Sequence, residues 1–246
     1  MQTVAFAVPI LPGKLKATKQ LGRMLDHDRR DEAIAIRRKA GIDRELAFIH
    51  YTPMGEFTII VWDTADVGKA FEVVGKDRSD FGVWFSDQLQ ELHGMDLSAP
   101  LSEMPHLETV LDWHSSRYTF DKLEGTALLY PLADGKLDSA RRWVETMLPG
   151  GRSHDEFVRT RKLLGIERQL FCIQSTPDQD VVIMFGEGSA NWFRNAFPTI
   201  ATSDDPFFKM WRKNVNEFGA VPLLVDSTPP KIEQIGHLTV QVPAHV

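Results

Sequence analysis

The sequence predicts an α+β protein built from two copies of one unit, each with the order strand, helix, strand, strand, helix, strand. Three observations lead to this prediction. A 22-residue stretch recurs further along the chain, short apolar runs recur at matching places, and segments with apolar residues at helical spacing lie between them. With 246 residues and 43% hydrophobic content, the chain can form either one large core or two small ones.

The internal repeat is clearest in the middle of each copy. Residues 32–53 and 156–177 align without a gap at a constant offset of 124 positions, and nine of the 22 pairs are identical. The identical pairs include Gly41 with Gly165 and the Thr-Pro that ends both stretches. Chance would give about one or two identities at average residue usage. The agreement therefore indicates a duplication.

Each copy opens with a strand, a turn and a helix. The apolar runs VAFAVPI (4–10) and TALLYPL (126–132) are typical of buried strands, and a Gly-Lys turn follows each. Apolar residues at helical spacing then predict helices over 15–25 and 137–147, and the second ends before Pro149.

A second short helix and a hairpin complete the middle of each copy. Ser153 and Glu156 have the spacing of a capping box, which opens a helix that Gly165 closes. ELAFIHYT (45–52) and QLFCIQST (169–176) are rich in strand formers and end at Thr-Pro, where a loop returns the chain into FTIIVWD or VVIMFGE. Each pair of runs therefore predicts a β-hairpin.

The last part of each copy predicts a helix and a strand. Aromatic residues at helical spacing within 71–89 and 197–215 predict helices with an aromatic underside. LETVLDWH (107–114) and VPLLVDS (221–227) are candidates for the last strand of each copy, and HLTVQV (237–242) for an extra strand.

This element order is that of the ferredoxin-like (βαββαβ) unit. We predict a first repeat over residues 1–115 and a second over 116–246, the second with an extra C-terminal strand. One such sheet has helices on a single face, so its other face is apolar and must be covered. The second copy is expected to supply that cover.

A duplicated unit of this kind resembles the dimeric α+β barrel superfamily. The resemblance covers most of residues 3–228 and depends on the element order and on the repeated Gly-Lys-Leu and Thr-Pro landmarks. It implies two sheets facing each other around a central cavity, here within one chain as tandem repeats. Members include cofactor-free oxygenases of aromatic polyketides, haem-binding enzymes, and small isomerases and cyclases, and the fold does not choose among them.

Composition argues against several partners. The net charge is −6 without long runs of one sign, so we expect no nucleic acid or membrane partner. The single cysteine, Cys172, favours a cytoplasmic location. No metal-binding, nucleotide-binding or hydrolase motif stands out, so no metal is expected. The expected partner is a small apolar or aromatic ligand, bound by a monomer or a homodimer.

Positions that differ between the copies are candidates for function. His50 in the first copy corresponds to Gln174 in the second, and alternation places His50 on the face of Phe48 and Tyr51 on the other. Neutral imidazole near pH 7 suits a proton acceptor or donor, so His50 is the candidate catalytic residue. The alternative is a strand-end residue that bonds a loop carbonyl. Gln174 and Tyr51 are candidate substrate-binding residues.

Three more residues are candidate substrate-binding groups. Trp113 and His114 follow the last strand of the first copy, and His93 precedes Gly94 at a helix end. A histidine beside a tryptophan could orient a substrate or ligate haem iron, since haem needs only one axial histidine. No cofactor is predicted, and haem remains an open alternative. For His93, the helix dipole gives a simpler explanation.

Two arginine pairs are kept in both copies, at positions 37/161 and 44/168. Guanidinium groups at these positions suit a carboxylate ligand. Salt bridges with Glu32/Glu156 or with Asp43/Glu167 are the simpler explanation.

For function, the sequence leaves two classes open. One is a cofactor-independent monooxygenase, cyclase or isomerase of a small aromatic or polyketide-like substrate, and the other is a non-catalytic ligand-binding or structural protein.

Overall fold

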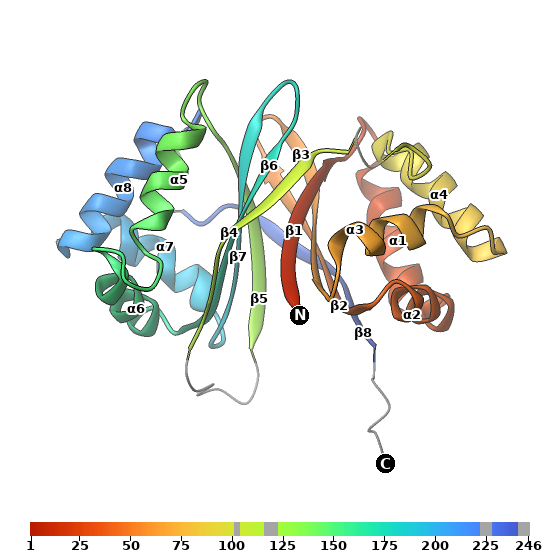
Figure 1. The fold of residues 1–246 in the computed structure, drawn as a ribbon, viewed down its shortest axis with the longest axis horizontal. Helices are drawn as coiled ribbons and strands as arrows, with labels where there is room; N and C mark the ends of the chain where they lie inside the picture. Colours follow the sequence, from red (N-terminus) through yellow and green to blue (C-terminus); the bar gives the residue numbers. More distant parts are fainter. Residues whose placement is uncertain (101–103, 116–122, 222–227, 241–246) are drawn as a thin grey trace, which may run out of the picture. The chain divides into compact units, whose positions relative to one another are not determined.

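The computed structural model describes residues 1–100, 104–115, 123–221 and 228–240. The chain forms two compact units. Unit 1 comprises Met1–Pro105 and the segment from Ile232 onward, and unit 2 comprises His106–Lys231. Each unit has a four-stranded sheet, which confirms the predicted α+β class with two ferredoxin-like repeats (Figure 1).

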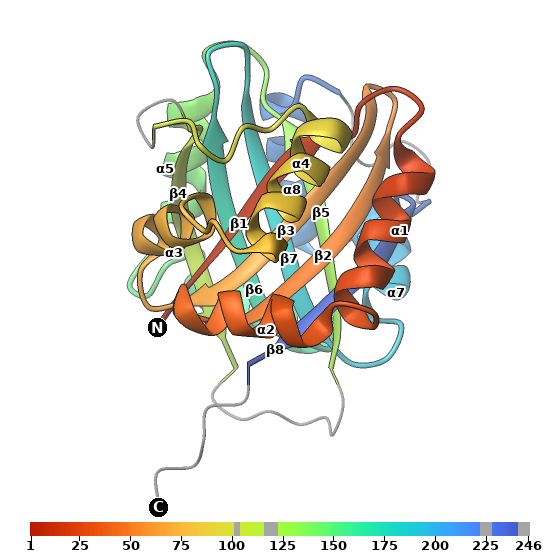
Figure 2. The same cartoon turned by 90° about the vertical axis from the view of Figure 1, so that its right-hand side faces the viewer.

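Unit 1 has sheet 1, with strand order β1-β3-β2-β8 and antiparallel neighbours. Helices α1 to α4 all lie on one face of this sheet (Figure 2). The elements are β1 (Gln2–Pro9), α1 (Leu15–Asp26), α2 (Arg30–Lys39), β2 (Ile42–Thr52), β3 (Gly55–Thr64), α3 (Val67–Gly75), α4 (Asp80–His93) and β8 (Ile232–Thr239).

Unit 2 has sheet 2, with strand order β4-β6-β7-β5, and helices α5 to α8 lie on one face of it. The aromatic stretch predicted as one helix in each repeat forms two helices instead, α3 with α4 and α7 with α8. The elements are β4 (His106–His114), β5 (Glu124–Pro131), α5 (Leu137–Glu145), α6 (His154–Leu163), β6 (Ile166–Ser175), β7 (Asp180–Gly188), α7 (Trp192–Thr202) and α8 (Pro206–Phe218).

The fourth strand of each sheet comes from the other sequence repeat. β4 ends the first repeat but pairs with β6, and β8 lies near the end of the second repeat but pairs with β2. Because β2 and β6 are matching strands, β4 and β8 are counterparts. A C-terminal strand is present as β8, at Ile232–Thr239 rather than at the predicted 237–242, and it takes in sheet 1 the place that β4 takes in sheet 2.

The predicted division at residues 115 and 116 differs from the observed units by these two strands. The physical reason is that a strand's own alternation indicates which faces it presents but not which edge it joins. The other predicted last strand spans residues 221–227. Of these, residues 222–227 lie outside the described part of the chain.

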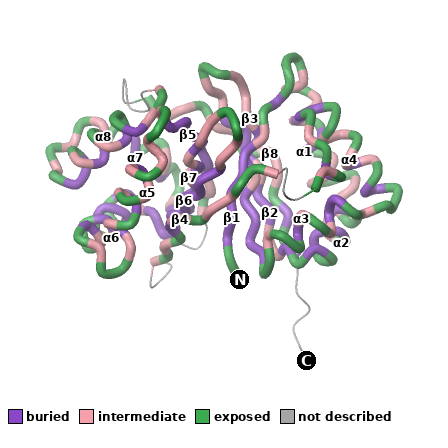
Figure 3. Tube along the Cα trace, turned by 45° about the horizontal axis from the view of Figure 1, so that its top comes forward, coloured by how far each residue is buried: buried purple, intermediate pink, exposed green. Residues whose placement is uncertain are grey.

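The two faces of sheet 1 carry different side chains. Ala47, Ile60 and Trp62 lie on the face covered by the helices, and alternation places Phe48 and Ile59 on the other. Both of the latter are buried, at 1% and 0% exposed, and Figure 3 shows that much of β2 is buried. The centre of the helix-free face therefore has apolar side chains, as the ferredoxin-like pattern predicts.

Glycine ends the short second helix of each repeat. Gly41 and Gly165 both have a φ of 70°, which L-residues with side chains rarely adopt. At the other end of α6, the predicted capping box is wrong, because the Ser153 side chain makes no cap hydrogen bond. The backbone of Ser153 has φ −112° and ψ 7°, which is not the extended conformation of a capping serine.

Gly22 allows α1 to pack directly on β8. A Cβ atom at Gly22 would lie 2.4 Å from the carbonyl oxygen of Ile235.

We expect Gly22→Ala to destabilise unit 1 by roughly 1–3 kcal/mol through this overpacking, although alanine is the better helix former by about 1 kcal/mol. Chemical denaturation measures the change. Gly68→Ala in α3 is the control, because its Cβ would meet only the Asp66 Oδ1 atom at 3.5 Å. Equal behaviour of the two variants would contradict the close approach.

Candidate functional site

An apolar cavity, cavity 1, lies between sheet 1 and the helices of unit 1. Its volume is about 80 Å³, well below the roughly 300–1,000 Å³ of pockets for drug-sized ligands. An aromatic ligand therefore requires movement of lining side chains, and Met95 has the flexible side chain that allows such movement. The polar residues that line it are Thr18, Arg37, Glu45, Thr58, Trp62 and His93.

Arg37, Glu45 and Trp62 form a buried polar cluster beside cavity 1. The Arg37 Nε and Nη2 atoms donate to the two Glu45 carboxylate oxygens at 3.1 and 2.9 Å, and the Trp62 indole N–H donates to Glu45 Oε2 at 2.6 Å. The Arg37 guanidinium also stacks over the Phe85 ring at 4.8 Å. At 2% and 6% exposed, Arg37 and Glu45 form a bidentate ion pair shielded from water.

The ion pairs observed for Arg37 and Arg161 differ from the predicted ones. Arg37 is paired as predicted, but with Glu45 rather than Glu32, because Glu32 is bound by Arg29 at 2.7 Å. In the second repeat the equivalent residue, Arg161, forms no ion pair among the described residues. The position that matches Glu45 is Gln169, whose side-chain oxygen accepts a hydrogen bond from Arg161 Nη1 at 3.2 Å.

A second cavity, cavity 2, lies at the equivalent place in unit 2. Its volume is about 60 Å³, and Arg161, Gln169 and Trp211 are among its lining residues. The remaining lining is mainly apolar and aromatic. The two repeats therefore have matching cavities that differ in charge.

His93 lines cavity 1 at the C-terminal end of α4. The side chain is 6% exposed, and its Nδ1 atom lies 2.8 Å from the Pro9 carbonyl oxygen. A carbonyl only accepts, so Nδ1 carries the proton and Nε2 of the neutral ring keeps its lone pair. Burial lowers the pKa of His93, and this effect outweighs the Pro9 hydrogen bond, which acts in the opposite direction. His93 thus presents a neutral proton acceptor in an apolar cavity.

His50 and Gln174 lie at equivalent positions on β2 and β6. They are 4% and 6% exposed. His50 lies opposite Phe57 on β3 and Ile232 on β8. Burial lowers the pKa of His50 to about 4, which keeps the ring neutral at pH 7. By alternation His50 is on the helix-free face, so it does not join the residues that line cavity 1. Its catalytic role stays a prediction.

Tyr51 is on the opposite face of β2 from His50, as alternation predicts. Its hydroxyl donates to Glu233 Oε2 at 3.0 Å, and the Lys19 Nζ atom lies 5.7 Å from its ring centre. These contacts tie α1, β2 and β8 together at one edge of unit 1. Tyr51 is not among the residues lining cavity 1, and its role in substrate binding stays a prediction.

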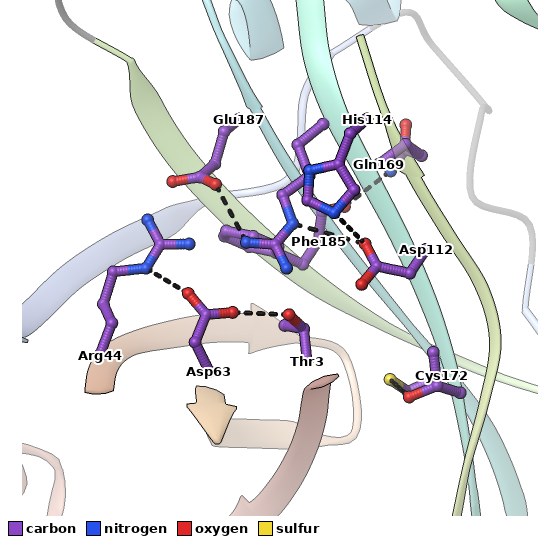
Figure 4. Close-up of polar contacts among 11 residues, drawn as sticks. Thr3, Arg44, Asp63, Asp112, His114, Gln169, Cys172, Phe185 and Glu187 are labelled. Atoms are coloured by element: carbon purple, nitrogen blue, oxygen red, sulfur yellow. Dashed lines mark hydrogen bonds and ion pairs between the residues drawn. The ribbon is translucent and has the colours of Figure 1, made fainter. Parts of the chain in front are cut away.

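Trp113 and His114 point to opposite faces of β4. The Trp113 ring packs edge to face on Phe157 of α6 at 5.8 Å. His114 is directed toward Asp112, with Nε2 at 3.1 Å from the carboxylate (Figure 4). The structure therefore does not bring the two side chains together on one face.

Neither His93 nor His114 fits the role of a haem ligand. His93 faces a cavity of about 80 Å³, which is far too small for a porphyrin. The His114 side chain is 43% exposed, and its Nε2 atom is held by Asp112. Elsewhere in the described chain, no group of three or more His, Cys, Asp or Glu side chains is placed to hold a metal ion.

The second arginine pair forms the predicted salt bridges with other partners. Arg44 Nε donates to Asp63 Oδ2 at 2.7 Å, and Asp63 also accepts from the Thr3 hydroxyl at 2.6 Å (Figure 4). Arg168 lies 3.6 Å from Glu187, the residue that matches Asp63 at the offset of 124, and 3.5 Å from Asp112. These arginines stabilise equivalent strands rather than an open site.

The fold and the two cavities define an α+β protein of tandem ferredoxin-like repeats. No family model matches the chain, and no curated protein matches its sequence. A candidate monooxygenase from Fusobacterium nucleatum subsp. nucleatum is similar in structure with a TM-score of 0.53 at 7% identity, over 96% of this chain and 93% of that one. An anthrone oxidase-like protein is similar with a TM-score of 0.52 at 11% identity, over 99% and 96%.

These similarities confirm the fold class predicted from the sequence. They extend over nearly the whole chain, so they include both repeats. At such low sequence identity the similarities support the fold assignment alone. The reaction must be argued from the residues of the site. In the described part of the chain, no helix has both the length and the apolar character needed to cross a membrane.

Proposed function

We propose that the chain binds a small aromatic or polyketide-like molecule in cavity 1 and acts on it as a cofactor-independent monooxygenase. The observation that carries this proposal is the neutral His93 ring in an apolar cavity, with its Nδ1 proton held by Pro9. The structural likeness to a candidate monooxygenase and to an anthrone oxidase-like protein agrees with the proposal.

His93 is suited to remove a proton from the substrate. Oxygenation without a cofactor begins with an electron-rich substrate anion that reacts with dioxygen: one oxygen atom enters the substrate as a carbonyl, and the other leaves as water with the two hydrogens lost from that carbon. The enzyme must therefore provide a base and an apolar environment. The Nε2 lone pair of His93 serves as that base, and the buried lining excludes water. Cyclisation and isomerisation need the same proton transfer and remain within the proposal.

His50 is the alternative base. Its neutral ring at pH 7 also satisfies the requirement for a proton acceptor. A non-catalytic binding protein is the second candidate function, favoured by the small volume of cavity 1. The two candidates differ in turnover rather than in binding.

The test uses anthrone as the probe, with oxygen uptake and absorbance recorded in the absence of added cofactor. We expect turnover by the wild type, and a loss of about 10²–10⁴-fold in kcat for His93→Gln if His93 is the base. His50→Gln places the residue of the second repeat in the first and tests the alternative base. His106→Gln, at an exposed position on β4, is the control.

The possible results separate the hypotheses. A loss confined to His50→Gln would transfer the role of base from His93 to His50. Saturable anthrone binding without oxygen uptake would favour the non-catalytic binding protein. Unchanged turnover in both variants would overturn the proposed proton transfer.

A further inference from the structure

Arg161 is a buried charge without an acidic partner among the described residues of unit 2. The side chain is 1% exposed. Its Nη1 atom donates to Gln169, whereas Nε and Nη2 have no hydrogen-bond partner. Burial lowers the pKa of Arg161 to about 9, so the group is still protonated at pH 7. A buried cation with open donors is costly unless an anion accompanies it.

The first repeat shows what these donors bind. In Arg37, the matching residue, the Nε and Nη2 atoms hold the two oxygens of Glu45. The same two atoms are the ones without a partner in Arg161, because the second repeat has Gln169 where the first has Glu45. The second repeat has therefore kept the carboxylate-binding fork and lost the carboxylate.

The surroundings of Arg161 do not replace that carboxylate. The Gln169 side-chain nitrogen donates to the Phe185 carbonyl at 2.8 Å, which fixes the amide and leaves one oxygen for Arg161. Phe157 and Trp211 lie 4.7 and 4.9 Å from the guanidinium carbon. The guanidinium carbon lies over these rings in favourable cation–π contacts. Arg37 has such a ring contact in addition to its carboxylate, so the rings accompany the anion rather than substitute for it.

We propose that cavity 2 binds a small organic monocarboxylate, whose two oxygens accept hydrogen bonds from Nε and Nη2 of Arg161. A planar carboxylate matches the guanidinium fork with two parallel hydrogen bonds. The volume of about 60 Å³ limits the ligand to a short chain, and the apolar lining suits its alkyl end. This binding concerns unit 2 and does not depend on the proposed oxygenase activity.

The experiment is a titration of the intact protein with acetate at constant ionic strength, followed by thermal unfolding and calorimetry. Acetamide is the neutral analogue, and chloride is the anion without a planar pair of oxygens. We expect a saturable rise in Tm with acetate alone. A Tm unaffected by acetate, or raised equally by acetamide or chloride, would overturn the proposal.

Gln169→Glu restores to the second repeat the carboxylate that Glu45 supplies in the first. We expect it to abolish the acetate response, whereas Gln90→Glu, with the same charge change at an exposed position of α4, retains it. Arg161→Lys keeps the charge without the fork and should weaken acetate binding by at least about tenfold. If Gln169→Glu does not fold, the lysine variant and the wild-type titration decide. Acetate binding that persists unchanged in either variant would refute the assignment.

Discussion

Replacing Glu45 with alanine is expected to destabilise unit 1 by about 3–5 kcal/mol, because it leaves a buried guanidinium without its counter-ion. Arg37 would keep its charge at 2% exposure, and the Trp62 indole N–H would lose its acceptor. Urea denaturation measures the free energy of unfolding. This loss is a large share of the 5–15 kcal/mol that typically stabilises a protein.

Two variants test the cause of that loss. Glu32→Ala removes the partner of Arg29, an ion pair in the same unit whose side chains are 47% and 21% exposed, and surface pairs contribute only about 0–1 kcal/mol. Arg37→Met combined with Glu45→Leu removes both charges and should recover much of the stability. A Glu45→Ala variant no less stable than Glu32→Ala would show that water reaches the buried pair.

The elements that could be predicted from the sequence are those fixed by local patterns. The hairpin of β2 and β3 follows from alternation and from the Thr-Pro turn, and its copy in the second repeat confirms the assignment. The exchange of β4 and β8 could not be predicted, because both are short strands whose residues do not identify the edge they join.

The candidate site was only partly accessible from the sequence. His93 was among the candidates, but its place in cavity 1 depends on the packing of α4 against the end of β1, which no local pattern specifies. Arg37 and Glu45 are eight residues apart, on a helix and a strand, so the sequence does not show that they form a pair.

The sequence contains one further signal for the site. The pair Glu45/Gln169 differs between the repeats while the arginine it contacts is kept, so one repeat loses a carboxylate beside a retained guanidinium. Like His50/Gln174, this pair differs in character between the two repeats. The Glu45/Gln169 difference indicates a binding site only if the arginine is buried, because an exposed arginine without a partner is solvated by water.

His50→Gln is expected to remove a strong acid sensitivity of the fold. The pKa of His50 is lowered by burial from 6.5 to about 4, and a shift of this size corresponds to about 3 kcal/mol. In the native state the ring stays neutral down to about pH 4, whereas in the unfolded chain it binds a proton below about pH 6.5. The stabilising contribution is therefore complete above pH 6.5 and is lost progressively as the pH falls toward 4.

The measurement is urea denaturation of wild type and His50→Gln at a series of pH values from 7 to 4. Glutamine occupies the matching position in the second repeat and does not titrate. The variant therefore retains a polar side chain whose charge does not change with pH. Carboxylates that titrate in the same range are present in both proteins, and their effects largely cancel in the difference. The stability of wild type relative to the variant should then fall by about 3 kcal/mol over this range. Parallel curves would mean that His50 takes up its proton at the same pH in the folded and the unfolded protein, which would contradict a pKa lowered by burial.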